Sequence, residues 1–272
     1  MSNIVQGEQI LNRQAYGLLT RSFESNLGLA QGLFNDQYQV SKFGYAADID
    51  TIDGAVDVWN VKGIYTGQPT GSPETLSIAS TSANDTSAGS GMQTMRIYGL
   101  YSSSDTTESN ELITLTGITP VVTTSTWYRV YRCVGESFGA GGINAGTVTV
   151  NHSSTTANVF TNVPAGLGQT VVAAYTIPAG VKGYLASLYI VLSRASGAAG
   201  SALVSVRKRT FGSGGYVATK FYSVTTSVPI HPMSPLYTIV CNPKDDIKIR
   251  VESVSDNDSI VTAEFDLHLI RQ

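Results

Sequence analysis

The residues Ile247-Lys-Ile-Arg-Val251 and Val261-Thr-Ala-Glu-Phe-Asp-Leu-His-Leu269 alternate between apolar and polar side chains with a period of two. Side chains with this period fall on opposite faces of an extended chain, so each run is predicted to be a β-strand with one buried face. The segment between them, Ser255-Asp-Asn-Asp258, is typical of a turn, and we expect it to join the two strands as a hairpin. The chain is therefore predicted to close as a β-sheet.

Short strands of the same kind are predicted upstream, separated by segments rich in Gly, Ser, Thr, Asn and Pro. In the first half they are expected at 55–61, 75–79, 93–101, 111–116, 126–134 and 147–151. In the second half they are expected at 158–163, 170–177, 183–192, 202–210, 215–224, 237–241, 246–251 and 260–269. Eight strands at this spacing, with no helical crossovers, favour an antiparallel jelly roll in the second half.

A chain of 272 residues can form two sandwiches of about 100 residues each. The glycine-rich stretch 135–146 has the composition of a domain junction. We therefore expect an N-terminal helical arm and connector at 1–54, a first β-sandwich at 55–140, and a second, jelly-roll-like β-sandwich at 141–272. The fold class is predicted to be all-β.

The predicted arm differs from the rest of the chain because its apolar residues recur at steps of three or four. Its stripe is marked by Leu11, Leu19, Phe23 and Leu27. This spacing predicts an amphipathic helix. The helix either folds back over one end of a sheet or buries its stripe against another subunit, which would make these four residues a partner interface.

Composition argues against two classes of partner. Only 14% of the residues are charged, the formal net charge is −3 and the pI is near 5.6. Such a chain has no long-range attraction for phosphate backbones or anionic lipid, so we expect neither nucleic acid nor membrane as a partner. No run of about 20 apolar residues is present to span a bilayer.

Residues that usually perform catalysis are sparse. The histidines, His152, His231 and His268, are isolated in the sequence, and we expect them to be solvated structural residues rather than metal ligands. Cys133 and Cys241 are expected to be small buried hydrophobes rather than a disulfide. No nucleophile motif and no phosphate-binding loop occurs, so the chain is predicted not to be an enzyme and to need no cofactor.

Three segments could suggest binding, and each has a simpler structural interpretation. The acidic group around Asp48-Ile-Asp50 has Ile52 and Asp53 where an EF-hand needs an oxygen ligand and Gly, so a turn without metal is expected there and at Asp256-Asn-Asp258. The aromatic residues of 127–131 are expected in the core, because no single strand face collects them. Arg207-Lys-Arg209 is expected to pair with carboxylates across a sheet or a subunit boundary.

A set of turns and strand starts between about residue 40 and the C-terminus resembles uncharacterised virion structural proteins of tailed bacteriophages. The motifs are Lys42-Phe-Gly, Asp48-Ile-Asp50, Val58-Trp59-Asn60, Met95-Arg-Ile-Tyr-Gly-Leu100, Ile113-Thr-Leu-Thr-Gly117, Thr119-Pro120, Ile143-Asn-Ala-Gly-Thr-Val148, Ala165-Gly-Leu-Gly-Gln-Thr170, Tyr175-Thr-Ile-Pro-Ala-Gly180 and Ala263-Glu-Phe-Asp-Leu267. The segment before Lys42 is not part of the resemblance, which would suit a variable attachment arm.

The resemblance implies a non-enzymatic building block located in the virion, attached to other virion proteins of the capsid, neck or tail and forming a homo-oligomer. Capsid decoration, head fibre, neck and tail accessory roles all remain open. The alternative is a receptor- or carbohydrate-binding tail protein, which would need exposed aromatic side chains. An enzyme such as a glycan depolymerase would need a pair of carboxylates.

Overall fold

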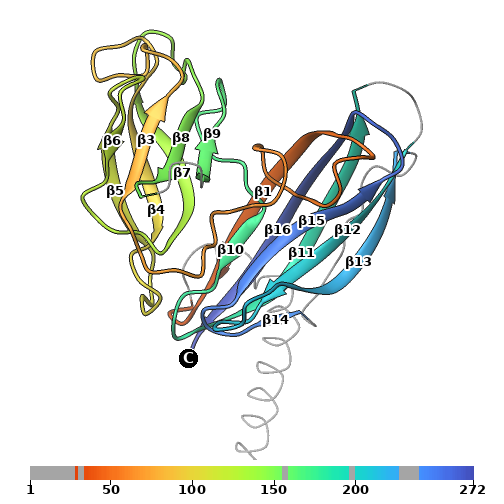
Figure 1. Cartoon of the computed structure of the whole chain (residues 1–272). Coiled ribbons are helices and arrows are strands. Elements are labelled where there is room, and N and C mark those ends of the chain that lie inside the picture. Colours follow the sequence, from red (N-terminus) through yellow and green to blue (C-terminus); the bar gives the residue numbers. More distant parts are fainter. Residues whose placement is uncertain (1–27, 30–33, 155–158, 196–199, 227–238) are drawn as a thin grey trace, which may run out of the picture.

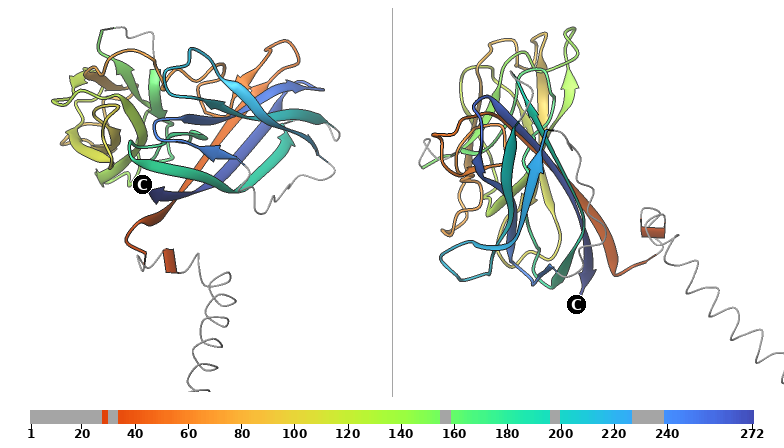
Figure 2. Two further views of the ribbon diagram at one scale, coloured as in Figure 1. Left: turned by 90° about the horizontal axis from the view of Figure 1, so that it is seen from below. Right: turned by 90° about the vertical axis from the view of Figure 1, so that its right-hand side faces the viewer.

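The computed structural model describes residues 28–29, 34–154, 159–195, 200–226 and 239–272, and within these helix is confined to residues 28–29. The predicted helical arm, with Leu11, Leu19, Phe23 and Leu27, lies outside the described residues. The described strands form four antiparallel sheets, which confirms the all-β prediction. Figure 1 shows that they gather into two lobes, and Figure 2 shows the same two lobes from below and from the side.

The first lobe, called here the terminal sandwich, is built from both ends of the described chain. Its first sheet has the order β1 (Gln37–Ile49), β16 (Ser259–Arg271), β11 (Val181–Arg194) and β14 (Val240–Cys241). Its second sheet has the order β10 (Ala174–Thr176), β15 (Asp246–Val254), β12 (Ser201–Arg209) and β13 (Val217–Thr225), with β2 (Val56–Asp57) also paired to β15. The two sheets share one buried apolar core.

The strand pairing of the terminal sandwich is that of a jelly roll. With β2 set aside, the first strand in chain order pairs with the eighth, the second with the seventh, the third with the sixth and the fourth with the fifth. The third also pairs with the eighth and the fourth with the seventh. This is the order produced by rolling one long double-stranded ribbon into two facing sheets.

The second lobe, the inserted sandwich, interrupts the jelly roll between β1 and β10. One sheet has the order β6 (Val121–Val122), β3 (Leu76–Ser80), β8 (Val148–His152) and β9 (Val159–Val163). The other has the order β5 (Ser109–Thr114), β4 (Met92–Leu100) and β7 (Arg129–Phe138). A separate apolar core, which includes Trp127 at 1% exposure, lies between these sheets.

Strand pairing divides the chain differently from the expected boundaries at 54/55 and 140/141. Segment 37–49, expected as connector, forms β1 and pairs with β16 at the far end of the chain. The run 158–163, expected in the jelly roll, forms β9 of the inserted sandwich, and β1 takes its place among the eight strands. The period-two pattern predicts that a segment is a strand, but it carries no information on which distant strand becomes its neighbour.

The expected hairpin at the C-terminus is wrong. Strand β15 lies in the second sheet and β16 in the first, so residues 255–258 carry the chain from one sheet to the other. Asp258 adopts a positive φ of 57° in this crossing. The predicted alternation of buried and exposed residues in the two strands is confirmed, because both strands turn their apolar faces into the shared core. The Pro-Ala-Gly turns at 164–166 and 178–180 have positive φ at Gly166 and Gly180, 78° and 67°.

Candidate functional site

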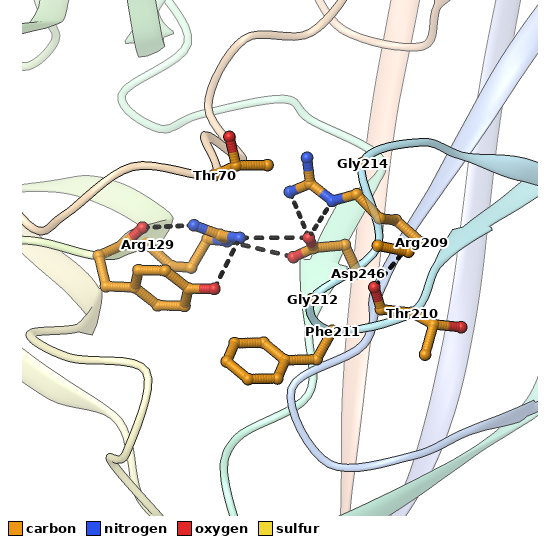
Figure 3. A pocket seen from close by; sticks show the side chains of 10 residues that line it. Thr70, Arg129, Arg209, Thr210, Phe211, Gly212, Gly214 and Asp246 are labelled. Carbon is orange, nitrogen blue, oxygen red and sulfur yellow. Dashed lines mark hydrogen bonds and ion pairs between the residues drawn. The ribbon is translucent and has the colours of Figure 1, made fainter.

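The junction between the two sandwiches holds the densest group of buried charges in the described residues. It contains a pocket of about 330 Å³, called here the junction pocket. The pocket is lined by Tyr128 and Arg129 of the inserted sandwich, by residues 209–214 between β12 and β13, and by Thr70 and Asp246 (Figure 3). Residues far apart in the sequence therefore meet at this point.

Asp246 lies between two guanidinium groups, one from each sandwich. Arg129 donates from Nε to Oδ1 at 3.1 Å and from Nη2 to Oδ2 at 3.2 Å, and Arg209 donates from Nε to Oδ2 at 2.8 Å. All three residues are nine-tenths or more buried. Burial disfavours the charged form of Arg129, but the adjoining carboxylate outweighs it, so the pKa of Arg129 is raised.

Arg129 uses its remaining donors on the inserted sandwich and the loop before it. Nη1 donates to the carbonyl oxygens of Pro69 at 2.9 Å and Tyr128 at 2.7 Å. Its guanidinium also lies over the Tyr128 ring, 3.8 Å from the ring centre. Arg129 is therefore fully engaged and holds the two sandwiches together.

A second buried carboxylate, that of Asp57, is also shared by two cationic side chains. Asp57 accepts from Lys248 Nζ at 2.6 Å and from Arg250 Nε at 2.6 Å. The ring of Tyr216 covers this strip, with Lys248 Nζ at 4.1 Å and the Arg209 guanidinium at 4.8 Å from its centre. Burial lowers the pKa of Lys248, and Asp57 opposes that shift.

The other side of the junction carries a second pocket of about 340 Å³, called the tyrosine pocket, lined by Val40, Ser41, Lys42, Tyr98, Glu108, Tyr131, Arg132 and Tyr175. Lys42 of β1 donates from Nζ to the carbonyl oxygen of Tyr131 in β7. Burial lowers the pKa of Lys42 to about 8. Tyr175 donates to Glu108 Oε1 at 3.0 Å. These bonds form a second link between the sandwiches.

The junction has the chemistry of a binding or tethering site. Both oxygens of Asp246 already accept from guanidinium groups, so neither is open to a substrate proton. Cys133 and Cys241 are free and buried, as expected, and burial raises the pKa of each thiol to about 12, which keeps both protonated.

The two acidic segments meet at the other end of the terminal sandwich. Carboxylate oxygens of Asp48, Asp50 and Asp258 lie within 4.8 Å of one another. Lys62 Nζ lies 3.3 Å from Asp48 and 3.0 Å from Asp53, so one ammonium group already offsets part of the negative charge of the cluster. The Asp50 backbone N–H donates to Asp53 Oδ2 at 2.7 Å, which is the hydrogen bond of the turn that the sequence predicted.

Other predicted residues are also placed. Arg207, Lys208 and Arg209 pair with Glu252, Asp245 and Asp246, as expected. The expectation of a solvated His152 is wrong: its ring is buried, contacts the Glu74 carboxylate and stacks on Phe160 at 4.3 Å. His268 is partly buried with Nε2 3.0 Å from Gln37 Oε1, and His231 lies outside the described residues.

Arg129, Asp246 and Lys42 were not predicted from the sequence to be junction residues. Arg129 shares a strand face with the buried Tyr131 and Cys133, but Asp246 shares its face with Lys248 and Arg250. Arg129 and Asp246 are also 117 positions apart, so no local pattern pairs them. Among the described residues there is no helix long and apolar enough to cross a bilayer.

No family model and no curated protein matches the chain. Solved structures with partial likeness include the Yersinia pseudotuberculosis-derived mitogen, 16% identical over 37% of this chain and 86% of that one, with a TM-score of 0.17. The VP2 subviral particle of infectious bursal disease virus is 10% identical over 87% of this chain and 72% of that one, with a TM-score of 0.24. A carbohydrate-binding module of the β-sandwich superfamily is 6% identical over 85% of this chain and 96% of that one, with a TM-score of 0.20. Likeness at this level carries no information on function.

Proposed function

We propose that the chain is a non-enzymatic structural component of a tailed-phage virion, attached to capsid, neck or tail through its N-terminal segment and self-assembling as an oligomer. The observation that carries the proposal is the jelly-roll order of the terminal sandwich. Jelly rolls build viral capsid and lectin domains, and this one agrees with the resemblance to virion proteins. A fold alone does not determine function, and two further features support the proposal: the contacts across the junction and the exposed edge of β13.

The junction makes the two sandwiches one rigid block. The Arg129–Asp246 ion pair and the Lys42–Tyr131 hydrogen bond cross between them at two separate places. Tyr131 adds a third crossing, because its hydroxyl donates to the Thr176 carbonyl oxygen at 2.6 Å. An arrangement with several buried crossings favours a fixed shape, as a particle subunit requires, over the domain closure used by many enzymes.

The surface offers a strand edge for self-assembly. Among the described residues β13 pairs as a strand only with β12, which leaves it at the edge of its sheet. Val217 and Phe221 of β13 and Leu203 of β12 are exposed by 69%, 56% and 38%. An open edge bordered by apolar side chains is suited to pairing with a second copy of the chain.

The attachment half of the proposal is tested by deleting residues 1–35, which ends just before β1. We expect the truncated chain to keep its β-sheet circular dichroism and cooperative unfolding but to be absent from purified particles. A truncated chain that still enters particles normally would place the attachment surface on the sandwiches. A truncated chain that unfolds would place residues 1–35 in the subunit's own core.

The self-assembly half is tested by Phe221→Lys, with Phe43→Lys on the opposite sheet as the matched control. We expect Phe221→Lys to shift the purified protein toward monomer in sedimentation velocity, while Phe43→Lys keeps the wild-type assembly state. Equal behaviour of the two variants would contradict a role for the β13 edge.

A second candidate function is receptor or carbohydrate binding, favoured by the outer face of the first sheet. Phe43 of β1 and Tyr189 of β11 lie on either side of Glu264 in β16 and are 40% and 42% exposed. Exposed rings that flank a carboxylate can stack on a sugar and accept its hydroxyl groups. Binding of a host glycan that is lost in both Phe43→Ala and Tyr189→Ala would support this candidate.

A further inference from the structure

The buried strip beside the junction pocket holds more positive than negative charge. Asp246 is shared by Arg129 and Arg209, and Asp57 is shared by Lys248 and Arg250. Of these six residues, only Arg129, Arg209 and Asp246 line the pocket, so two cations face one carboxylate there. Buried charge is costly unless it is paired, so this excess favours a negative group from outside the described residues.

Arg209 directs unused donor capacity at the pocket. Its Nε bonds to Asp246 at 2.8 Å, and its Nη2 bonds to Asp246 and to the Gln68 carbonyl oxygen. Its Nη1 makes no hydrogen bond within the described part of the chain, and Figure 3 shows this nitrogen turned away from Asp246. The residue is only 8% exposed and lines the pocket, so the free donor belongs to a largely buried charge.

The opposite wall is a glycine-rich turn that leaves room for a ligand. Gly212, with φ of 80°, and Gly214 line the pocket, and a Cβ at either position would meet nothing within 4 Å. Lys244 Nζ lies 4.7 Å from the centre of the Phe211 ring, which forms part of the same wall. The pocket is therefore open, positively charged and bordered by an aromatic ring.

We propose that the junction pocket binds a small oxyanion, a phosphate or carboxylate group, through Arg209 Nη1, with Arg129 as the second positive charge. This site goes beyond the structural role proposed above and does not depend on it. A volume of about 330 Å³ is at the small end of ligand pockets, so the ligand has the size of a free anion or of one acidic sugar residue.

The test uses the full-length protein and two probes, inorganic phosphate and glucuronate, in isothermal titration calorimetry. Glucose is the neutral analogue of glucuronate, and sodium chloride matches the ionic strength. Arg209→Gln removes the free donor and leaves Asp246 in a balanced pair with Arg129. Arg207→Gln is the matched control, because Arg207 lies on the same strand and pairs with Glu252 outside the pocket.

We expect at least one probe to bind wild-type protein and Arg207→Gln equally, and to bind Arg209→Gln about 10- to 100-fold more weakly, as for one lost hydrogen bond to a charged group. Binding of phosphate alone points to a phosphorylated ligand, and binding of glucuronate but not glucose points to an acidic sugar. Binding of neither probe, or equal binding by Arg209→Gln, would overturn the proposal.

Gly214→Asp provides an independent check if Arg209→Gln does not fold. This variant adds a carboxylate at a residue that lines the pocket, where no Cβ clash arises. We expect it to fold, to melt at or above the wild-type temperature, and to bind neither probe. A folded Gly214→Asp variant that binds the probes with wild-type affinity would also overturn the proposal.

Discussion

Asp246→Asn is the substitution that most directly tests how the two sandwiches are joined. The side chain keeps its size but loses the negative charge that Arg129 and Arg209 share. Both guanidiniums then remain buried without a counter-charge, and removal of one partner from a buried ion pair costs about 3–5 kcal/mol. That is a large part of the about 5–15 kcal/mol by which folded proteins are stable.

The loss should fall unequally on the two sandwiches. Arg129 can be hydrated once the junction opens, whereas Asp246 and Arg209 both belong to the terminal sandwich. Trp127, at 1% exposure, lies in the core of the inserted sandwich and reports on it, whereas Trp59, at 2% exposure, packs in a small separate cluster with Val172 and with Ala174 of β10 and reports on that side of the junction. Urea unfolding is therefore followed by fluorescence in Trp127→Phe and Trp59→Phe backgrounds.

In the wild-type background we expect the two tryptophan signals to share one midpoint, and in Asp246→Asn we expect Trp59 to respond at lower urea than Trp127. Glu136→Gln is the control, because Glu136 pairs with Arg96 at 2.8 Å with 44% of its side chain exposed. Such a surface pair contributes at most about 1 kcal/mol. Coincident midpoints in Asp246→Asn, with a loss no larger than that of Glu136→Gln, would refute the reasoning.

Three further predictions concern other buried contacts. Lys42 has a folded pKa of about 8 against 10.5 for the free side chain, so the unfolded chain binds more protons between these values and stability from this group rises with pH across that window. We expect urea midpoints at pH 7.5 and 9.5 to show that rise in wild type relative to Lys42→Met, and parallel profiles would contradict it. Asp85 accepts from the backbone N–H groups of Met92, Ala145 and Gly146 at 2.8 Å, so Asp85→Ala should lower the unfolding free energy by about 3 kcal/mol. Asp36→Ala, at an exposed position before β1, should change it by less than about 0.5 kcal/mol, and equal effects would contradict the role of Asp85. A Cβ at Gly44 would lie 2.5 Å from Ala173 N and Val58 O, so Gly44→Ala should lower the melting temperature, while Gly71→Ala, with nothing within 4 Å, should leave it unchanged.

Most strands of the described residues could be predicted from alternation, because a half-buried strand records its burial every second residue. Strand β1 was not predicted, because at the junction its polar and small residues face inward and an apolar residue faces outward. Lys42 and Gly44 point inward while Phe43 is 40% exposed, so apolarity does not mark the buried face. Lys42 can be buried because its ammonium group donates to a backbone carbonyl oxygen, and position 44 is a glycine because the backbone of a distant segment lies against it. Neither contact can be predicted from the neighbouring residues in the sequence.

The charged residues show the same division between local and distant information. The basic run at 207–209 was predicted to pair with carboxylates, and it does, because β12 lies beside β15, which carries Asp246 and Glu252 and follows directly after Asp245. The link between Arg129 and Asp246 depends on how two sandwiches dock, and docking is set by shape and charge across the whole junction. The acidic turns at 48–53 and 256–258 meet for the same kind of reason, because β1 and β16 are partners.

The insertion between β1 and β10 also determines the order in which the chain can fold. β1 pairs with β16, so Gln37 cannot form its strand pairing until Ile270 has been synthesised. During synthesis the inserted sandwich emerges complete long before that partner does, and by folding first it brings the ends of its own segment together and shortens the loop that remains to be closed. Pairing of such distant segments is slow, and until it happens β1 has no strand partner on either side. Because β1 is exposed early, we expect this strand, rather than either core, to be the part of the molecule most prone to aggregation on the ribosome. Its outward residues Ser41, Phe43 and Tyr45 carry no charge that would repel another strand.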